Sequence, residues 1–367
     1  MIRVFHYLLD HRVGGPHVYV LSLVGHLSGS VESVILTCGK GPVTERPLAN
    51  LRIASRWLYP FEIIINAAYI IWLFRSAAKR KGVIFNVHGS VNLAPIIAAK
   101  VLKVPVVWHF HETVGTMTFL AAIGKRLLQN ERYRYVVVAG RAAEIYEIND
   151  CALIPGAVDT EFWRRAPAPL QRAKDADGKL PLRVIVVANL NPLKGIDLLL
   201  EAINLIKQSC EVIIVGAELG SHKNYAARLY RKSIQLLENK SVQFLGWQSA
   251  REVQLLLSTA DIYVLPSRSE ACPIALLEAM AMECVCVATP VGDVPQILRY
   301  GKYGILVNDC SASAIANGLS EALAMPCHVR QELGKQARLW IDENYSLRKF
   351  SDLHQEIYAA LNEGYEG

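Results

Sequence analysis

Short runs of consecutive apolar residues alternate along this chain with longer stretches in which apolar residues recur at helical spacing. A run such as IYVLP (262–266) has the length and β-branched content of a strand buried on both faces of a parallel sheet. Strand patterns recur at residues 2–9, 33–39, 83–89, 105–112, 135–140, 152–155, 182–190, 211–217, 242–247, 262–266, 285–289 and 304–307. Helical patterns separate most of these runs, so the chain is predicted to be an α/β protein.

The chain divides into two halves with the same alternation. Its 367 residues and 52% hydrophobic content are sufficient for two cores. Between them, residues 156–181 contain prolines and charges but no apolar period, which is typical of an interdomain linker. The predicted parts are an N-terminal domain at 1–160, a linker at 161–181, a second domain at 182–342 and a C-terminal helix at 343–367.

The stretch 260–297 carries the clearest candidate chemistry. It reads as a strand, a short loop, a helix and a second strand, with Glu270 ahead of the helix and Glu278 inside it. A helix N-terminus attracts anions, and phosphate is its usual occupant. The backbone N–H groups predicted to be free for this role are those of Ile274, Ala275 and Leu276. Two carboxylates beside a phosphate site could hold the hydroxyls of a sugar and a ribose.

A glycine pair follows the first predicted strand. Gly14 and Gly15 lie in the loop DHRVGGPH, and a helix is predicted to begin near Val18. Strand, glycine loop and helix form a phosphate-binding arrangement in outline. The pair is not a GxGxxG sequence, so a dinucleotide fingerprint is absent.

Histidines cluster at the ends of two predicted strands. His88 ends one strand, and period two places His109 and His111 on one face of the next strand, with Phe110 opposite. Ligands of open α/β sheets bind beyond the carboxyl ends of strands, so these imidazoles are candidates for polar contacts. No third ligand follows at a fitting spacing, and Glu112 is the only nearby carboxylate. No metal site is therefore predicted.

The charge of +6 is concentrated in the N-terminal part. Residues 1–110 contain 12 Lys/Arg and 4 Asp/Glu. This excess favours an anionic partner such as a membrane surface or a phosphorylated lipid, although a solvated surface explains it equally well. The most hydrophobic window, Ile63–Phe74, is shorter than the roughly 20 residues of a membrane span, so a buried or interfacial helix at Glu62–Ala78 is predicted. No nucleic-acid-binding motif is present.

The eight cysteines favour a reduced, cytoplasmic protein. They are scattered, form no CxxC pair and have no framework spacing. Cys284 and Cys286 lie in a strand pattern, where core packing is a better interpretation than metal binding. The N-terminus has no signal-peptide pattern, and a cytoplasmic protein, peripheral at the inner face of the membrane, is expected.

The C-terminal half resembles the retaining, nucleotide-sugar-dependent glycosyltransferases of family 4. The motifs that carry the resemblance are PSRSEACPIALLEAMA (266–281) with its Glu-x7-Glu pair, KGIDLLLEAI (194–203), FLGW followed by ADIYVLPS, and VATPVGDVPQIL (287–298). In the N-terminal half, RVGGPHVYVLSL, FNVHGS, WHFHE and IPGAVDTEFW have counterparts in the same order. The resemblance implies the GT-B fold, in which two Rossmann-like doubly wound domains face each other across a cleft. It also implies a C-terminal helix that packs back on the N-terminal domain.

The resemblance also implies roles for single residues. Glu278 would hydrogen-bond the ribose of the nucleotide, and Glu270 would contact hydroxyls of the donor sugar. Lys194 would meet the diphosphate, together with the amides near Ala275 and Leu276 and the Gly14–Gly15 loop. The base would lie near Gly246 and Trp247, and His111 would lie near the sugar and acceptor.

Three positions depart from the family pattern. Asn189 stands where an Arg is usual, so part of the diphosphate charge lacks its usual partner or another cation replaces it. Gly156–Ala157 replaces a common Asn-Gly pair, and Gln296 replaces a common Glu.

The expected function is that of a retaining glycosyltransferase. A UDP- or GDP-linked sugar would be the donor, no metal or other cofactor would be needed, and a polysaccharide or lipid-linked glycan would be the acceptor. Two alternatives remain open: a nucleotide-sugar epimerase on the same fold, and a catalytically weak partner subunit.

Overall fold

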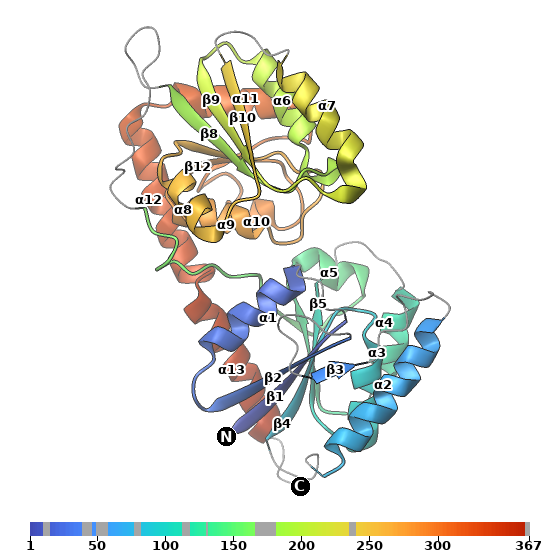
Figure 1. The fold of residues 1–367 in the computed structure, drawn as a ribbon. Coiled ribbons are helices and arrows are strands. Elements are labelled where there is room, and N and C mark those ends of the chain that lie inside the picture. Colours follow the sequence, from blue (N-terminus) through green and yellow to red (C-terminus); the bar gives the residue numbers. More distant parts are fainter. Residues whose placement is uncertain are drawn as a thin grey trace. The chain divides into compact units, whose positions relative to one another are not determined.

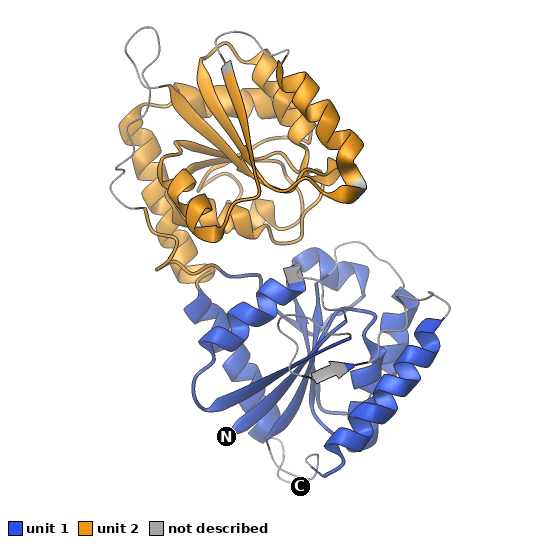
Figure 2. Ribbon diagram, in the orientation of Figure 1, with its two compact units in different colours: residues 1–157, 347–367 blue, residues 158–346 orange. Residues whose placement is uncertain are grey.

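The computed structural model describes residues 1–9, 15–38, 46–48, 58–76, 82–111, 118–129, 131–165, 181–234 and 240–363. They form two units, one made of residues 1–157 and 347–367 and the other of residues 158–346 (Figure 2). The sequence predicts boundaries at 160 and 342. Of the predicted linker, residues 166–180 lie outside the described residues. The remainder does not act as a free linker, because Trp163 is buried in the core of the second unit.

The first unit is a seven-stranded sheet between two helical layers. Its strand order is β3-β2-β1-β4-β5-β6-β7, and all its pairings are parallel. The strands are β1 (Ile2–Leu8), β2 (Val31–Cys38), β3 (Arg46–Leu48), β4 (Val83–His88), β5 (Val106–Phe110), β6 (Tyr133–Val137) and β7 (Cys151–Leu153). The helices are α1 (Gly15–His26), α2 (Tyr59–Phe74), α3 (Leu93–Leu102), α4 (Thr118–Leu127), α5 (Gly140–Ile145) and α13 (Leu347–Glu363).

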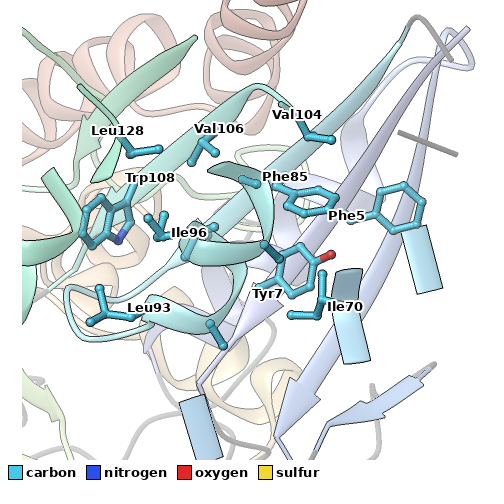
Figure 3. Close-up of a cluster of buried hydrophobic side chains, with 14 of the residues drawn as sticks. Phe5, Tyr7, Ile70, Phe85, Leu93, Ile96, Val104, Val106, Trp108 and Leu128 are labelled. Atoms are coloured by element: carbon cyan, nitrogen blue, oxygen red, sulfur yellow. The ribbon is translucent and has the colours of Figure 1, made fainter. Parts of the chain in front are cut away.

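Alternate residues of these strands face two different cores. On one face, Phe5, Phe85 and Trp108 pack with residues of α2 and α3 (Figure 3). Burial of side chains this large stabilises the fold by about 1.5–3 kcal/mol each. The opposite face packs against α1 and α13, as Figure 1 shows, and combines apolar residues with histidines. The prediction that Phe110 points away from His109 is thus confirmed.

The second unit has a six-stranded parallel sheet in the order β10-β9-β8-β11-β12-β13. Its strands are β8 (Leu182–Val187), β9 (Cys210–Val215), β10 (Lys240–Gly246), β11 (Ile262–Leu265), β12 (Val285–Ala288) and β13 (Ile305–Leu306). Its helices are η2 (Pro192–Lys194), α6 (Ile196–Leu205), η3 (Gly220–His222), α7 (Lys223–Ile234), α8 (Ala250–Ser258), α9 (Ile274–Ala281), α10 (Val294–Ile297), α11 (Ala312–Ala324) and α12 (Cys327–Asn344). Core residues of α6, α7 and α11 share one face of the sheet, and those of α8, α9 and α12 share the other.

The predicted α/β class with two doubly wound sheets is confirmed. The predicted return of the C-terminal helix is also confirmed, since α13 packs on α1, β1 and β4. The predicted bounds of one helix, Glu62–Ala78, were wrong. Helix α2 begins at Tyr59, because Pro60 suits a first helical turn, and it ends at Phe74. No strand was predicted at Arg46–Leu48, where the edge strand β3 pairs with β2.

Candidate donor site

The candidate site of the second unit lies where its strand order reverses. Strand β8 lies between β9 and β11, so the chain extends the sheet first toward β10 and later toward β13. In open α/β sheets, ligands bind beyond the carboxyl ends of the strands at such a switch point. Lys194 ends η2, which follows β8, and Glu270 lies in the loop after β11. The two loops that flank the switch point therefore carry the two predicted residues.

Lys194 and Glu270 form a two-pronged ion pair. Lys194 Nζ donates to Glu270 Oε1 at 2.8 Å and to Oε2 at 2.9 Å. Ser267 Oγ donates to the same Oε1 at 2.6 Å. The Glu270 side chain is only 9% exposed and that of Lys194 30% exposed, so the ammonium group lies on the solvent side of the pair. An incoming anion can reach the lysine, while the hydrogen bond from Ser267 holds the carboxylate in place.

Two glycines allow the loops to approach this closely. Gly195 has φ of +64°, and a Cβ there would lie 1.9 Å from the carbonyl oxygen of Pro266. Gly292 has φ of +54°, and a Cβ there would lie 2.2 Å from the carbonyl oxygen of Glu270. No side chain fits at either position, so the site requires glycine at both.

A second ion pair fastens the same two loops. Arg268 donates to both carboxylate oxygens of Asp197, at 2.8 and 2.7 Å, and to the carbonyl of Pro192 at 2.7 Å. Tyr225 Oη also donates to Asp197, at 2.7 Å. Sequence reasoning missed this network. A signal was available, because Arg268 is two residues before Glu270 and Asp197 lies in the first turn after the Lys194 motif.

The N-terminus of α9 is open, but it offers fewer donors than predicted. Pro273 provides no side-chain cap. The amide of Leu276, expected to be free, donates to the carbonyl of Pro273 at 3.0 Å because the first turn is tight. Among the described residues, the amides of Ile274 and Ala275 make no hydrogen bond, so these two remain for an anion.

Glu278 lies one turn into α9 in a different environment. Burial raises the pKa of its carboxyl to about 8. No hydrogen bond or ion pair reaches this carboxyl from any part of the chain that the structure describes. The hydroxyl of buried Tyr263 lies close enough to both Glu270 and Glu278 to feel their charges, and it also has no partner among the described residues. The carboxyl of Glu278 and the hydroxyl of Tyr263 can therefore form hydrogen bonds with a ligand at this site.

Asn189 follows β8, while Gly246 and Trp247 lie at the end of β10, the edge strand on the side of β8 away from β11. The Asn189 side chain accepts a hydrogen bond from the Ala217 amide at 3.0 Å and so joins the loops after β8 and β9. Gly246 ends β10 with φ of +67°, and Trp247 follows it with 71% of its surface exposed. Asn189 therefore has a structural partner here, and the indole offers a free aromatic face.

The remaining predicted residues belong to the first unit. Gly14 and Glu112 lie outside the described residues, and Gly15 is the first residue of α1. His111 follows β5, and its Nε2 lies 3.0 Å from Nδ1 of His88. Burial lowers the pKa of His111 to about 3, with a smaller contribution from His354. His111 is consequently a neutral hydrogen-bonding group at pH 7.

The part of the chain that carries this site matches a known protein family. Residues 169–340 match the family model described as glycosyl transferases group 1. The D-inositol 3-phosphate glycosyltransferase of Corynebacterium jeikeium is 30% identical over 205 residues, which are 53% of this chain and 48% of that protein. The amylovoran biosynthesis glycosyltransferase AmsK of Erwinia amylovora is 30% identical over 37% of this chain and 34% of its own length. The chain thus spans about half the length, or less, of these relatives.

Solved structures match over nearly the whole chain. The Anabaena protein Alr3699/HepE in complex with UDP has a TM-score of 0.82 at 16% identity, covering 98% of this chain and 100% of its own. A glycosyltransferase of Rickettsia africae has a TM-score of 0.81 at 18% identity, covering 98% of both chains. At these identities the likeness shows the fold. Residues 169–340 thus match the model of the glycosyl transferases group 1, and the chain as a whole has the GT-B fold.

Proposed function

We propose that this protein transfers a sugar from a nucleoside diphosphate sugar to an acceptor hydroxyl and retains the anomeric configuration. The Lys194–Glu270 pair, beside the open N-terminus of α9 at a switch point, is the observation on which this proposal rests. The family match and the named relatives support it. HepE has been solved with UDP and with UDP-glucose, so UDP-linked sugars are the first donors to test.

In the proposed reaction, each group of the donor site has its own task. Lys194 and the amides of Ile274 and Ala275 would hold the diphosphate and stabilise the charge that grows on it as the sugar departs. Lys194 would turn from Glu270 toward the phosphates, which frees the carboxylate to accept hydrogen bonds from sugar hydroxyls. This charge stabilisation comes from the protein alone, and the proposed transfer uses no metal ion.

Glu278 and Trp247 would hold the nucleoside. The ionised carboxylate of Glu278 would accept hydrogen bonds from the ribose hydroxyls. The exposed indole of Trp247 can stack on a base, an interaction worth about 1–3 kcal/mol in nucleic-acid complexes.

The transfer step is an exchange of two bonds at the anomeric carbon. The acceptor oxygen forms a bond to this carbon on the face from which the phosphate oxygen leaves. The proton of the acceptor hydroxyl passes to the departing phosphate oxygen. Neutral His111, assigned near the sugar by resemblance, would position a hydroxyl by hydrogen bonding and would not act as a nucleophile.

Replacing Lys194 tests the proposal. Lys194→Met is expected to lower the transfer rate by roughly 10²–10³-fold, the usual cost of removing one donor to developing negative charge. The matched control is Lys207→Met, because Lys207 is exposed and follows the C-terminal end of α6, whose N-terminal end adjoins Lys194. Donors come from a thermal-shift screen of UDP- and GDP-sugars, and products are measured with and without acceptor. An unchanged rate in Lys194→Met contradicts the proposed site, and donor-sugar conversion without acceptor identifies an epimerase instead.

The acceptor is proposed to be a polysaccharide or lipid-linked glycan at the cytoplasmic face of a membrane. One side of α2 exposes large apolar residues: Phe61 is 60% exposed, Ile64 64% and Trp72 57%. Arg75 lies over the Trp72 ring. Lys125 and Arg126 end α4, which contacts α3, the helix that packs on α2. Aromatic and basic residues on one helix face are typical of proteins that lie on anionic bilayers. Among the described residues, no helix is long and apolar enough to cross a membrane.

Vesicle binding tests this surface. The protein is expected to float with vesicles that contain phosphatidylglycerol and not with pure phosphatidylcholine vesicles. The double variant Phe61→Ser and Trp72→Ser should weaken binding at least about tenfold, because each aromatic contributes about 1.5–3 kcal/mol on burial. Leu339→Ser, on an equally exposed apolar residue of α12, is the control. Equal binding by all three proteins contradicts the assignment of α2.

A further inference from the structure

Five histidines gather on one face of the first unit's sheet. His6 comes from β1, His88 from β4 and His109 from β5, while His111 follows β5 and His354 comes from α13. Four of them are at most 1% exposed, and His111 is partly exposed. The imidazoles stack, with ring centroids 4.4 Å apart for His88 and His109 and 5.4 Å apart for His109 and His354.

The sheet register brings three of these side chains together. His88 pairs with His109 across parallel strands β4 and β5, so both point to the same face. His111 follows two residues later on that face and contacts His88, with 3.0 Å between His88 Nδ1 and His111 Nε2. One nitrogen of each imidazole lies within 4.8 Å of the corresponding nitrogen of the others. His88 of the neighbouring strand β4 therefore provides the third imidazole that His109 and His111 lack in the sequence.

Buried nitrogens in this group have no partner. His88 Nε2, His109 Nδ1 and His109 Nε2 make no hydrogen bond to any described residue. A buried polar group without a partner costs about 1–3 kcal/mol, so native structures rarely keep several together without a use for them. The tyrosine ring of Tyr19 packs edge-on against His109 and His111 and leaves these nitrogens unsatisfied.

We propose that His88, His109 and His111 bind one divalent transition-metal ion of the zinc or cobalt class. Three neutral imidazoles with a fourth, open position form a ligand set that such ions accept. Zn–N bonds of about 2.0–2.1 Å place tetrahedral ligand nitrogens about 3.4 Å apart. His88 Nδ1 and His111 Nε2, 3.0 Å apart, are already near this spacing. Ligand nitrogens as far apart as 4.8 Å would have to approach each other by about 1 Å, which side-chain rotation can provide.

The surroundings fit an ion that binds through nitrogen lone pairs. His88 and His109 are buried, and a neutral imidazole offers one nitrogen lone pair for a ligand bond. The partly exposed His111 gives the ion a route from solvent. An ion bound here would occupy the lone pair of His111, so it would inhibit sugar transfer; this consequence alone depends on the proposed function.

Cobalt titration tests the site directly. The full chain, stripped with a chelator and dialysed, is titrated with Co²⁺ and followed by visible absorption. One equivalent should bind, with the d–d bands of a four- or five-coordinate nitrogen site and without a thiolate charge-transfer band, and Zn²⁺ should displace it. No saturable binding overturns the proposal. A thiolate band also overturns it, because it places the ion on cysteines.

Single variants identify the ligands. His88→Gln and His109→Gln should each lower the affinity for cobalt at least about 10- to 100-fold. Losses of this size are usual when a residue that only hydrogen-bonds to a metal ligand is replaced, so loss of a ligand itself should cost no less. The control His328→Gln, at an exposed position in α12, should bind as the unmodified protein does. If a buried variant loses its near-ultraviolet circular dichroism, His111→Gln at the partly exposed edge takes its place. Unchanged affinity in the folded variants means that the histidines only pack against one another, and it overturns the proposal.

Discussion

Glu270 and Glu278 belong to one Glu-x7-Glu motif, but the structure gives their carboxyl groups opposite conditions. Glu270 receives an ammonium and a hydroxyl, so its charge is compensated. The carboxyl of Glu278 has neither an ion pair nor a hydrogen bond with any described residue, and burial raises its pKa to about 8. The carboxyl of Glu278 is thus mainly protonated at neutral pH, whereas that of Glu270 is held in an ion pair, and this difference separates their tasks before any donor binds.

This difference predicts a pH dependence of nucleotide binding. Below about pH 8, free Glu278 is mainly protonated, and ribose hydroxyls bind best to the ionised form. UDP affinity should therefore rise with pH, by at most about tenfold per unit, and level off above about pH 8. Titration calorimetry between about pH 6 and 9 measures it, with Glu278→Gln as the comparison. A profile that is the same in both proteins would show that Glu278 does not control the binding.

At the residue scale, sequence motifs identify the side chains that lie at the ends of strands. They do not identify the residues that these side chains contact. Lys194 and Glu270 could be chosen from the motifs, whereas their direct contact depends on β8 lying next to β11. The error at Leu276 arose because a tight first turn of α9 uses its amide internally. Ser267 and Arg268 were missed because short polar side chains and loop arginines are common without a role.

At the scale of the elements, α13 is placed by contacts with segments far away in the sequence. Its Tyr358 hydroxyl accepts a hydrogen bond from Asn86 of β4 at 2.8 Å, and His354 stacks on His109 of β5. The amphipathic pattern predicted a helix here, and only the resemblance indicated where it packs. The sequence pattern grouped His88, His109 and His111 at the ends of strands. It did not indicate that His6 and His354 join them, because these two are separated by nearly the whole chain.

The packing of α13 predicts acid lability of the first unit. Burial, assisted by the neighbouring imidazole of His354, lowers the pKa of His6 to about 3, and burial lowers that of His354 to about 4. Unfolded histidines titrate near 6.5, so below that pH the unfolded state binds more protons. As the pH decreases from about 6.5 to 4, the free energy of unfolding of the first unit should fall by up to about 1.4 kcal/mol per pH unit for each buried histidine.

Hydrogen exchange measured by mass spectrometry at about pH 7 and 5.5, corrected for intrinsic rates, resolves the two units. Protection of β1, β4 and β5 should decrease at the lower pH. The second unit serves as an internal control, since its described residues include no buried histidine. Equal losses in both units would contradict the assignment to the histidine cluster.

At the scale of the whole molecule, the chain passes from the first unit to the second and back again. Its two crossing points lie side by side, because Val158 bridges Ser346 and the Val158 amide donates to the Tyr345 carbonyl at 2.9 Å. The alternation of apolar runs was enough to predict two parallel α/β sheets. The sequence did not fix the boundaries, because residues 158–165 look like linker yet include the buried side chains of Val158 and Trp163.

The central claim is that the carboxyl edge of the second sheet binds a nucleoside diphosphate sugar through the α9 segment. Calorimetric titration of UDP into the unmodified protein, Glu278→Ala and the control Glu321→Ala, an exposed residue of α11, tests it most directly. Loss of a hydrogen bond to a charged group costs about 1.5–3 kcal/mol, so UDP affinity should fall about 10- to 100-fold in Glu278→Ala alone. If UDP and GDP bind Glu278→Ala as tightly as they bind the unmodified protein, the assignment of this edge as the donor site is wrong.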